Sequence, residues 1–125
     1  MPAVQRAHAS EGNLATAISG MVVQTLREHT GRGPTKSRTY LNDDLICVVL
    51  QGTLSGPEQR LIADGKSELV LNTHHAFKAI VQADLVAGVE TLTGRRVIAF
   101  LCDKSIEPDV KVKSFLLAPE GTAEG

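Results

Sequence analysis

Apolar side chains recur every three or four residues near the start of the chain, the spacing of one helix face. Four of them follow this spacing: Leu14, Ile18, Val22 and Leu26. Ser10 and Asn13 are residue types that cap the first turn of a helix. Gly31 is a typical residue just past a helix end. We therefore predict a helix that begins at Ser10 or Asn13 and ends near His29.

Two short segments after this helix have the character of strands. Residues 36–41 (KSRTYL) are polar, whereas residues 45–50 (LICVVL) form the most apolar run in the chain, which we extend to about Thr53. Asn and Asp tolerate left-handed backbone and bond locally, so Asn42, Asp43 and Asp44 suit a tight turn. The two segments are expected to form a hairpin.

A second helical region begins at residues 55–58 (SGPE). Ser55 can cap the helix while Glu58 reaches back to the cap, and proline is tolerated in the first turn. Gly65 interrupts the pattern, since glycine costs about 1 kcal/mol inside a helix. We predict a short helix, a break at Gly65, and a long helix over 67–92. Strands are then expected over 96–102 and 110–117, joined by a loop over 103–109.

The predicted order of elements is αββαββ, and it contains a weak repeat. EHTGRGP and TLTGRRV both close a helix with Thr-Gly-Arg and lead into a hairpin. This order predicts an α+β two-layer sandwich in which both helices cover one face of a four-stranded antiparallel sheet. The arrangement is a permuted ferredoxin-like fold with the second and fourth strands in the centre. VIAFLC is unusually apolar for an edge strand, so either this strand order is wrong or another subunit covers that edge; we expect a homodimer.

Length and charge restrict the class of protein. The 125 residues form one domain, which we place at 13–118, with a flexible N-terminus at 1–12 and a flexible tail at 119–125. Thirteen basic against fourteen acidic residues give a net charge of −1, which speaks against a nucleic-acid partner. The longest apolar run has six residues, far fewer than the ~20 of a membrane span. A cytoplasmic protein is expected.

Residues 30–37 (TGRGPTKS) are reminiscent of a phosphate-binding loop, but their spacing and their helix-before-strand context both differ from that motif. A looser anion site remains open. Gly31 and Gly33 could expose backbone amides beside Arg32, Lys36 and Arg38. Arg95 could join them if the two Thr-Gly-Arg corners converge. The alternative is a helix end followed by an extended connection that Pro34 enforces.

Other candidate groups are weighed in the same way. His74 and His75 are adjacent, so they point about 100° apart on a helix and are expected at the surface, unless a dimer brings pairs together at a metal or pH-sensing site. Asp43 and Asp44 could meet the acidic residues of 103–109 at one end of the sheet and bind a divalent cation; turn chemistry is the alternative.

The remaining candidates are expected to be structural. Cys47 and Cys102 suit buried apolar positions. Alternation in VKVKS predicts buried valines and solvent-facing Lys111 and Lys113. No catalytic residues can be proposed from spacing, and no cofactor or metal is indicated.

TGRGPTKSRTYLNDDLICVVLQGTLSGPEQRLIA resembles the small bacterial proteins known as the MpsC family, the Na-translocating-system protein MpsC. TGRRVIAFLCDKSIEPD is similar to the second block of that family, in which TGR leads a strand closed by an aspartate. The resemblance covers about residues 13–118. This chain has Cys102 where relatives often carry Ser, so no hydroxyl role is transferred to it.

The resemblance implies association with a bacterial system that couples ions, membrane potential or inorganic-carbon uptake, and it implies no catalytic residues. We expect a non-catalytic accessory or regulatory protein, located at the membrane only through a transport-complex partner. An anion- or ligand-binding sensor, or an enzyme, that uses the loop at 31–38 is the alternative.

Overall fold

A computed structural model of the protein describes the backbone of residues 2–119 and the side chains of residues 12–119. The predicted flexible tail at 119–125 lies outside these residues except for Pro119. Seven elements follow one another: α1 (Pro2–Thr30), β1 (Lys36–Asn42), β2 (Leu45–Gln51), α2 (Gly56–Ala63), α3 (Ser67–Thr93), β3 (Val97–Ser105) and β4 (Val110–Leu117).

The four strands form one antiparallel sheet in the order β1-β2-β4-β3. The predicted α+β class, the strand order and the central positions of β2 and β4 are confirmed. The apolar third strand has two explanations: a wrong strand order, or coverage of that edge by another subunit. The first is removed, since β3 does lie at an edge. Coverage of β3 by a second subunit stays a prediction.

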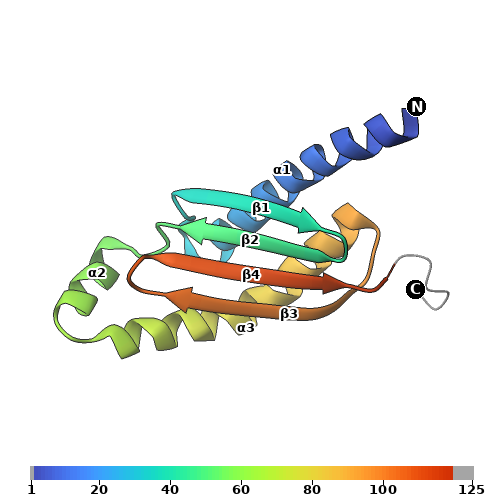
Figure 1. Ribbon diagram of the computed structural model, residues 1–125. Coiled ribbons are helices and arrows are strands. Elements are labelled where there is room, and N and C mark those ends of the chain that lie inside the picture. Colours follow the sequence, from blue (N-terminus) through green and yellow to red (C-terminus); the bar gives the residue numbers. More distant parts are fainter. Residues whose placement is uncertain (1, 120–125) are drawn as a thin grey trace.

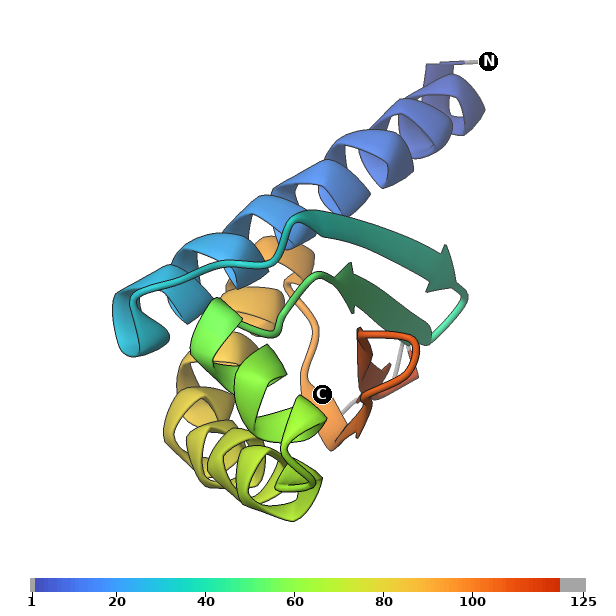
Figure 2. The same ribbon diagram turned by 90° about the vertical axis from the view of Figure 1, so that its left-hand side faces the viewer.

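The long helices α1 and α3 lie on one face of the sheet, and α2 lies beyond its end (Figures 1 and 2). The core between the two layers is formed by Ile18, Val22, Leu26, Ile46, Val48, Leu50, Val81, Leu85, Val89, Phe115 and Leu117. Branched aliphatic residues dominate it, as a chain with 3% aromatic residues requires. Side chains alternate between the faces of a strand, so every second residue of each strand points away from the helices.

The helix boundaries confirm the predicted break and correct the predicted start. Ser55 caps α2 in a capping box with Glu58, and α2 is separated from α3 at Gly65, whose φ is 78°. However, α1 begins at Pro2, so the start predicted at Ser10 or Asn13 is wrong. Residues 3–11 include Ala, Gln, Arg and Glu, strong helix formers that favour continuation. The predicted flexibility of residues 1–12 stays a prediction.

The two Thr-Gly-Arg corners have matching geometry. Gly31 and Gly94 both have left-handed φ, 79° and 69°, and each donates its amide to a carbonyl of the preceding helix. Thr30 and Thr93 likewise each donate a hydroxyl hydrogen bond to the helix carbonyl four residues earlier. The weak sequence repeat therefore corresponds to a repeated helix-end structure.

The face of β4 that packs on the helices differs from the prediction. Lys111 and Lys113 are 8% and 1% exposed, whereas Val110 and Val112 lie on the opposite face. Phe115 and Leu117 fill the core. Because side chains alternate between the two faces of a strand, the two lysines lie on the same face as Phe115 and Leu117. The prediction that the lysines face solvent is wrong because the bulky end of β4, rather than the local alternation, determines its orientation.

Candidate anion-binding site

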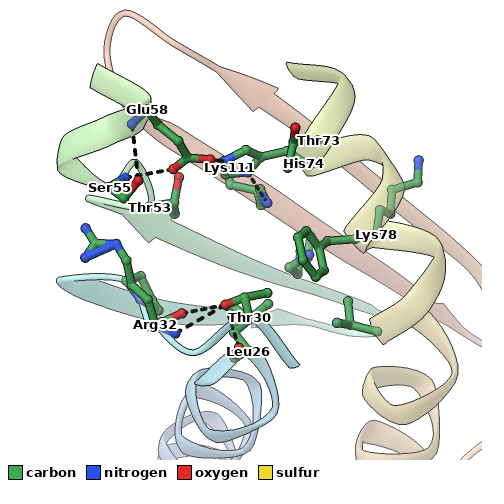
Figure 3. Close-up of a pocket in the computed structure, with 15 residues that line it drawn as sticks. Leu26, Thr30, Arg32, Thr53, Ser55, Glu58, Thr73, His74, Lys78 and Lys111 are labelled. Carbon is green, nitrogen blue, oxygen red and sulfur yellow. Dashed lines mark hydrogen bonds and ion pairs between the residues drawn. The ribbon is translucent and has the colours of Figure 1, made fainter. Parts of the chain in front are cut away.

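A cavity of about 230 Å³ lies between the C-terminal end of α1, the segment that follows β2, the first half of α3, and β4 (Figure 3). Most of its lining residues are polar or charged, and Leu26, Pro34, Phe77 and Val81 add apolar surface. The lining consists of Leu26, Thr30, Arg32, Gly33, Pro34, Thr53, Ser55, Glu58, Thr73, His74, Phe77, Lys78, Val81, Lys111 and Lys113. Polar groups beside apolar surface in a concave site are typical of small-ligand sites.

The two buried lysines form the floor of this cavity. They are two residues apart on β4, so both side chains leave the same face of the sheet. The Lys113 ammonium lies 3.4 Å from the Cys102 sulfur and 5.9 Å from the centre of the Phe100 ring. Among the described residues, no carboxylate forms an ion pair with either lysine.

A chain of three side chains crosses one wall. Lys111 Nζ lies 2.9 Å from Nδ1 of His74, and Nε2 of His74 lies 2.9 Å from Oε2 of Glu58. The other oxygen of Glu58 accepts the backbone amide of Ser55 at 2.7 Å. Because the ammonium can only donate, His74 accepts at Nδ1 and donates from Nε2 to the carboxylate. The helix cap of α2 is thus joined to β4 through α3.

The surroundings shift the pKa of each member of this chain. Burial, followed by the charge of Lys113, lowers the pKa of Lys111 to about 8. Burial, followed by the charge of Lys111, lowers the pKa of His74, so the imidazole is neutral at pH 7. Burial opposes ionisation of Glu58, but the Ser55 amide and His74 outweigh it and lower the pKa of that carboxyl group.

The same effects act on the second buried lysine. Burial lowers the pKa of Lys113, and the half-buried Lys78 adds a repulsive charge from α3. Four cationic side chains therefore line the cavity, namely Arg32, Lys78, Lys111 and Lys113, against the single carboxylate of Glu58. An anion in the cavity would offset both the repulsion and the desolvation of these cations.

The residues predicted for an anion site are only partly brought together. Arg32 and Gly33 line the cavity, although the Arg32 guanidinium donates to the carbonyl oxygens of Gly52 and Leu54 at 3.0 Å each. Lys36 and Arg38 are exposed residues of β1 that point away from the helices. The loop at 31–38 therefore contributes to the cavity through its first half alone.

Arg95 lies at the other end of the molecule. Its guanidinium pairs with Asp44 and donates to the carbonyl oxygen of Ala118 at 2.7 Å. The carbonyl oxygens that Arg32 bonds to follow the C-terminal end of β2, whereas Asp44, the partner of Arg95, precedes the N-terminal end of β2. The two arginines are therefore separated by the length of a strand, and the suggested convergence of the two corners is wrong.

The acidic residues of the two hairpin turns are separated in the same way. Gln51 pairs with Val110, and Leu45 pairs with Leu116, so the turns lie at opposite ends of the sheet. The suggested cation site of Asp43, Asp44 and the 103–109 segment is therefore not formed. Across residues 12–119, no group of three or more His, Cys, Asp or Glu side chains could hold a metal ion.

The segment at 103–109 is itself shorter as a loop than predicted, because β3 continues to Ser105. Asp109 accepts the backbone amides of Thr53 and Leu54 and pairs with Lys104. This carboxylate therefore joins the end of β2 to the second hairpin, which is a structural role.

The remaining predicted candidates divide between the cavity and the surface. His74 belongs to the wall and is part-buried, which corrects its predicted surface position, while His75 is exposed. Cys47 and Cys102 are half-buried rather than fully buried as predicted, they form no disulfide, and they lie on opposite faces of the sheet. Lys78, Lys111 and Lys113 were not predicted as cavity residues. The two lysines of β4 lie an even number of residues from Phe115 and Leu117, and this spacing could have indicated that all four share one face of the strand.

A family model described as "Na+-translocating membrane potential-generating system (MpsC)" matches residues 10–119. The chain belongs to the MpsC family. Comparison with curated proteins and with solved structures gives no match. The resemblance on the two Thr-Gly-Arg blocks is thereby confirmed over nearly the whole chain.

The MpsC match includes every residue that lines the cavity, from Leu26 to Lys113. The name of the family refers to an ion-translocating membrane system. None of the helices in the described part of this MpsC chain is both long and apolar enough to cross a membrane.

Proposed function

We propose that this MpsC protein is a non-catalytic accessory or regulatory component of an ion-translocating system, and that it acts by binding a small anion in the cavity. The observation that carries the proposal is the pair of buried lysines, Lys111 and Lys113, that line the cavity without a carboxylate partner. Buried charges without a nearby counter-charge are costly, so a site that keeps two of them is suited to an anionic ligand.

The size of the cavity restricts the ligand. A volume of about 230 Å³ holds roughly seven water molecules, at about 30 Å³ each. Inorganic phosphate, bicarbonate and small carboxylates are small enough to enter a cavity of this volume. The hydroxyl group of Ser55 accepts the Glu58 amide, so its own hydrogen can be donated to such an anion.

A binding role agrees better with the cavity than a catalytic one. His74 is neutral but already engaged on both ring nitrogens, and Glu58 is held by the α2 cap. Neither group is free to exchange a proton with a substrate. Lys111 could act as a nucleophile, given its lowered pKa, and an enzyme that uses it is the second candidate.

Thermal unfolding with added anions tests the binding proposal. Phosphate, bicarbonate or acetate at about 100 times its Kd should stabilise the wild type by ~2.7 kcal/mol. Lys113→Met should abolish the shift, because it removes the buried charge while the methionine side chain keeps a similar volume. Lys36→Met makes the same charge change on the exposed face of β1 and should retain the shift. A wild type that responds to none of these anions contradicts the binding proposal.

The accessory role has its own test. Affinity capture of the full chain from gently solubilised membranes of its native host should retain subunits of an ion-translocating complex, and retention should depend on the anion identified above. Capture without any transport subunit would contradict the accessory role and leave the binding result intact. Turnover of any small anion that requires Lys111 would favour the enzyme instead.

A further inference from the structure

No described segment covers the face of the sheet that points away from the helices, and this face carries many apolar residues among polar ones such as Lys36, Gln51 and Ser114. Figure 1 views the sheet from this side. We call it the open face, and its apolar residues are Tyr40, Leu45, Cys47, Val49, Leu101, Val110, Val112 and Leu116. Four of these are notably exposed, with Leu101 at 67%, Tyr40 at 49%, Leu116 at 40% and Leu45 at 38%.

A contiguous apolar surface of this kind marks an interaction site. Leu45 pairs with Leu116, and Leu116 pairs with Ala99, so these residues form one row across three strands. Val49 pairs with Val112 in a second row. Antiparallel sheets with one apolar face normally bury that face against another layer.

Two charges of opposite sign border the open face at the same level. Arg38 pairs with Val49, Val49 with Val112, and Val112 with Asp103. Arg38 is thus on edge strand β1, and Asp103 is in the same row on edge strand β3. Three strand spacings of about 4.8 Å separate the two backbones by roughly 14 Å, which is too far for an ion pair within one chain.

We propose that the open face is the interface of a homodimer in which two sheets pack face to face, about a twofold axis that is parallel to the strands and lies between β2 and β4. This rotation exchanges β1 with β3 and β2 with β4 while it keeps each row at its own level. Arg38 then faces the partner's Asp103, and Asp103 faces the partner's Arg38. Val49 lies over the partner's Val112 at the centre.

A second copy suits this face better than an unrelated partner because the pattern is self-complementary. One rotation pairs both border charges and stacks the apolar rows, as an isologous interface requires. The strands of two aligned sheets cross at about 30°, and the sheets lie about 10 Å apart. The long Arg38 side chain can span this distance. The apolar character of β3 is also explained, since Leu101 would be covered at the face rather than at the edge.

The size of the face limits the strength of the dimer. Four strands at about 4.8 Å and seven residues at about 3.3 Å give a face of roughly 19 by 23 Å. This is small compared with the ~800 Å² per partner that a standard interface buries. We therefore expect a dimer that dissociates on dilution in the micromolar range.

Charge reversal tests the proposed orientation. Arg38→Glu sets two acidic groups against each other, and Asp103→Lys sets two basic groups against each other, so each variant alone should be monomeric. An equimolar mixture of the two should form a heterodimer with both pairs restored. The double variant R38E/D103K should form a homodimer as the wild type does. Sedimentation velocity over a wide concentration range measures all four.

A control separates this interface from other surfaces. Leu101→Glu should abolish dimerisation, whereas Leu69→Glu, at a residue of α3 that is 52% exposed, should leave it unchanged; circular dichroism checks that each variant is folded. A wild type that stays monomeric at the highest concentration overturns the proposal. A dimer that survives Leu101→Glu, or a mixture that fails to associate, overturns it as well.

Discussion

Lys111 Nζ lies 2.9 Å from Nδ1 of His74, on the side of β4 that the helices cover. This contact places a cationic side chain of the sheet against an imidazole of α3 and determines the tautomer that the imidazole adopts. Through Glu58, the contact extends to the first turn of α2. Any ligand that approaches Lys111 therefore acts on three elements at once.

Replacement of Lys111 by methionine is expected to stabilise the protein at neutral pH. The pKa of Lys111 is about 8 in the folded protein and 10.5 ordinarily. The unfolded chain therefore binds more protons between pH 8 and 10.5, and wild-type stability rises with pH across that window. Below pH 8 the full penalty is present, roughly 3 kcal/mol at 1.36 kcal/mol per pH unit, partly offset by the bond to His74.

Urea unfolding of the wild type and Lys111→Met at pH 7, 8, 9 and 10 measures this difference. The advantage of the variant should decrease as the pH rises from 8 to 10. Lys36→Met, at an exposed lysine of β1, is the matched control and should show no such trend. A difference between wild type and Lys111→Met that does not change with pH would contradict the buried-charge account.

His74 is expected to make the protein sensitive to mild acid. Burial and the Lys111 charge lower the pKa of His74 from its ordinary 6.5, so the unfolded chain takes up a proton before the folded protein does. Stability is therefore lost as the pH falls below 6.5. His74→Gln should reduce the slope of stability against pH between 7 and 5. His75→Gln, at the exposed neighbouring residue, should keep the wild-type slope, and equal slopes for all three proteins would refute the prediction.

Gly52 is expected to be intolerant of any side chain. Its φ is 66°, and a Cβ atom there would lie 2.0 Å from Oγ1 of Thr35, which is itself bonded to the Gln51 carbonyl. Gly52→Ala should cost about 3 kcal/mol or more from backbone strain and overlap together. Gly65→Ala has a similar φ with no atom within 4 Å and should cost about 1–2 kcal/mol. Chemical denaturation of both compares them, and equal losses would mean that the Thr35 contact relaxes freely.

The two Thr-Gly-Arg corners are expected to contribute unequally to stability. Arg95 pairs with a carboxylate and a backbone carbonyl, and its side chain is 17% exposed. Arg32 bonds to two carbonyl oxygens at an exposed position. Arg95→Met should cost about 1.5–3 kcal/mol, the range for hydrogen bonds to charged groups, and Arg32→Met less. Arg96→Met, at an exposed neighbour, should have little effect on thermal unfolding, and a larger loss for Arg32 than for Arg95 would reverse the ranking.

The local part of the fold could be predicted from sequence because its signals lie within a few residues of each other. The Ser55–Glu58 capping box, the break at Gly65 and the glycine that ends each long helix depend on backbone preferences and on bonds over three or four residues. The αββαββ order then left few antiparallel arrangements, and the order β1-β2-β4-β3 is one of them. The predicted start of α1 failed because good helix formers precede the proposed caps.

The candidate site could not be predicted in the same way, because its parts lie far apart in the chain. Alternation in VKVKS is satisfied with either face inward, since one set of residues is apolar and the other carries long alkyl stems. Phe115 and its packing against α1 and α3 decide that Lys111 and Lys113 point inward. The sequence by itself determined the elements and their caps, which are local. Only the tertiary structure decided which face of β4 is buried and which end of the sheet each arginine reaches, since these depend on contacts between distant segments.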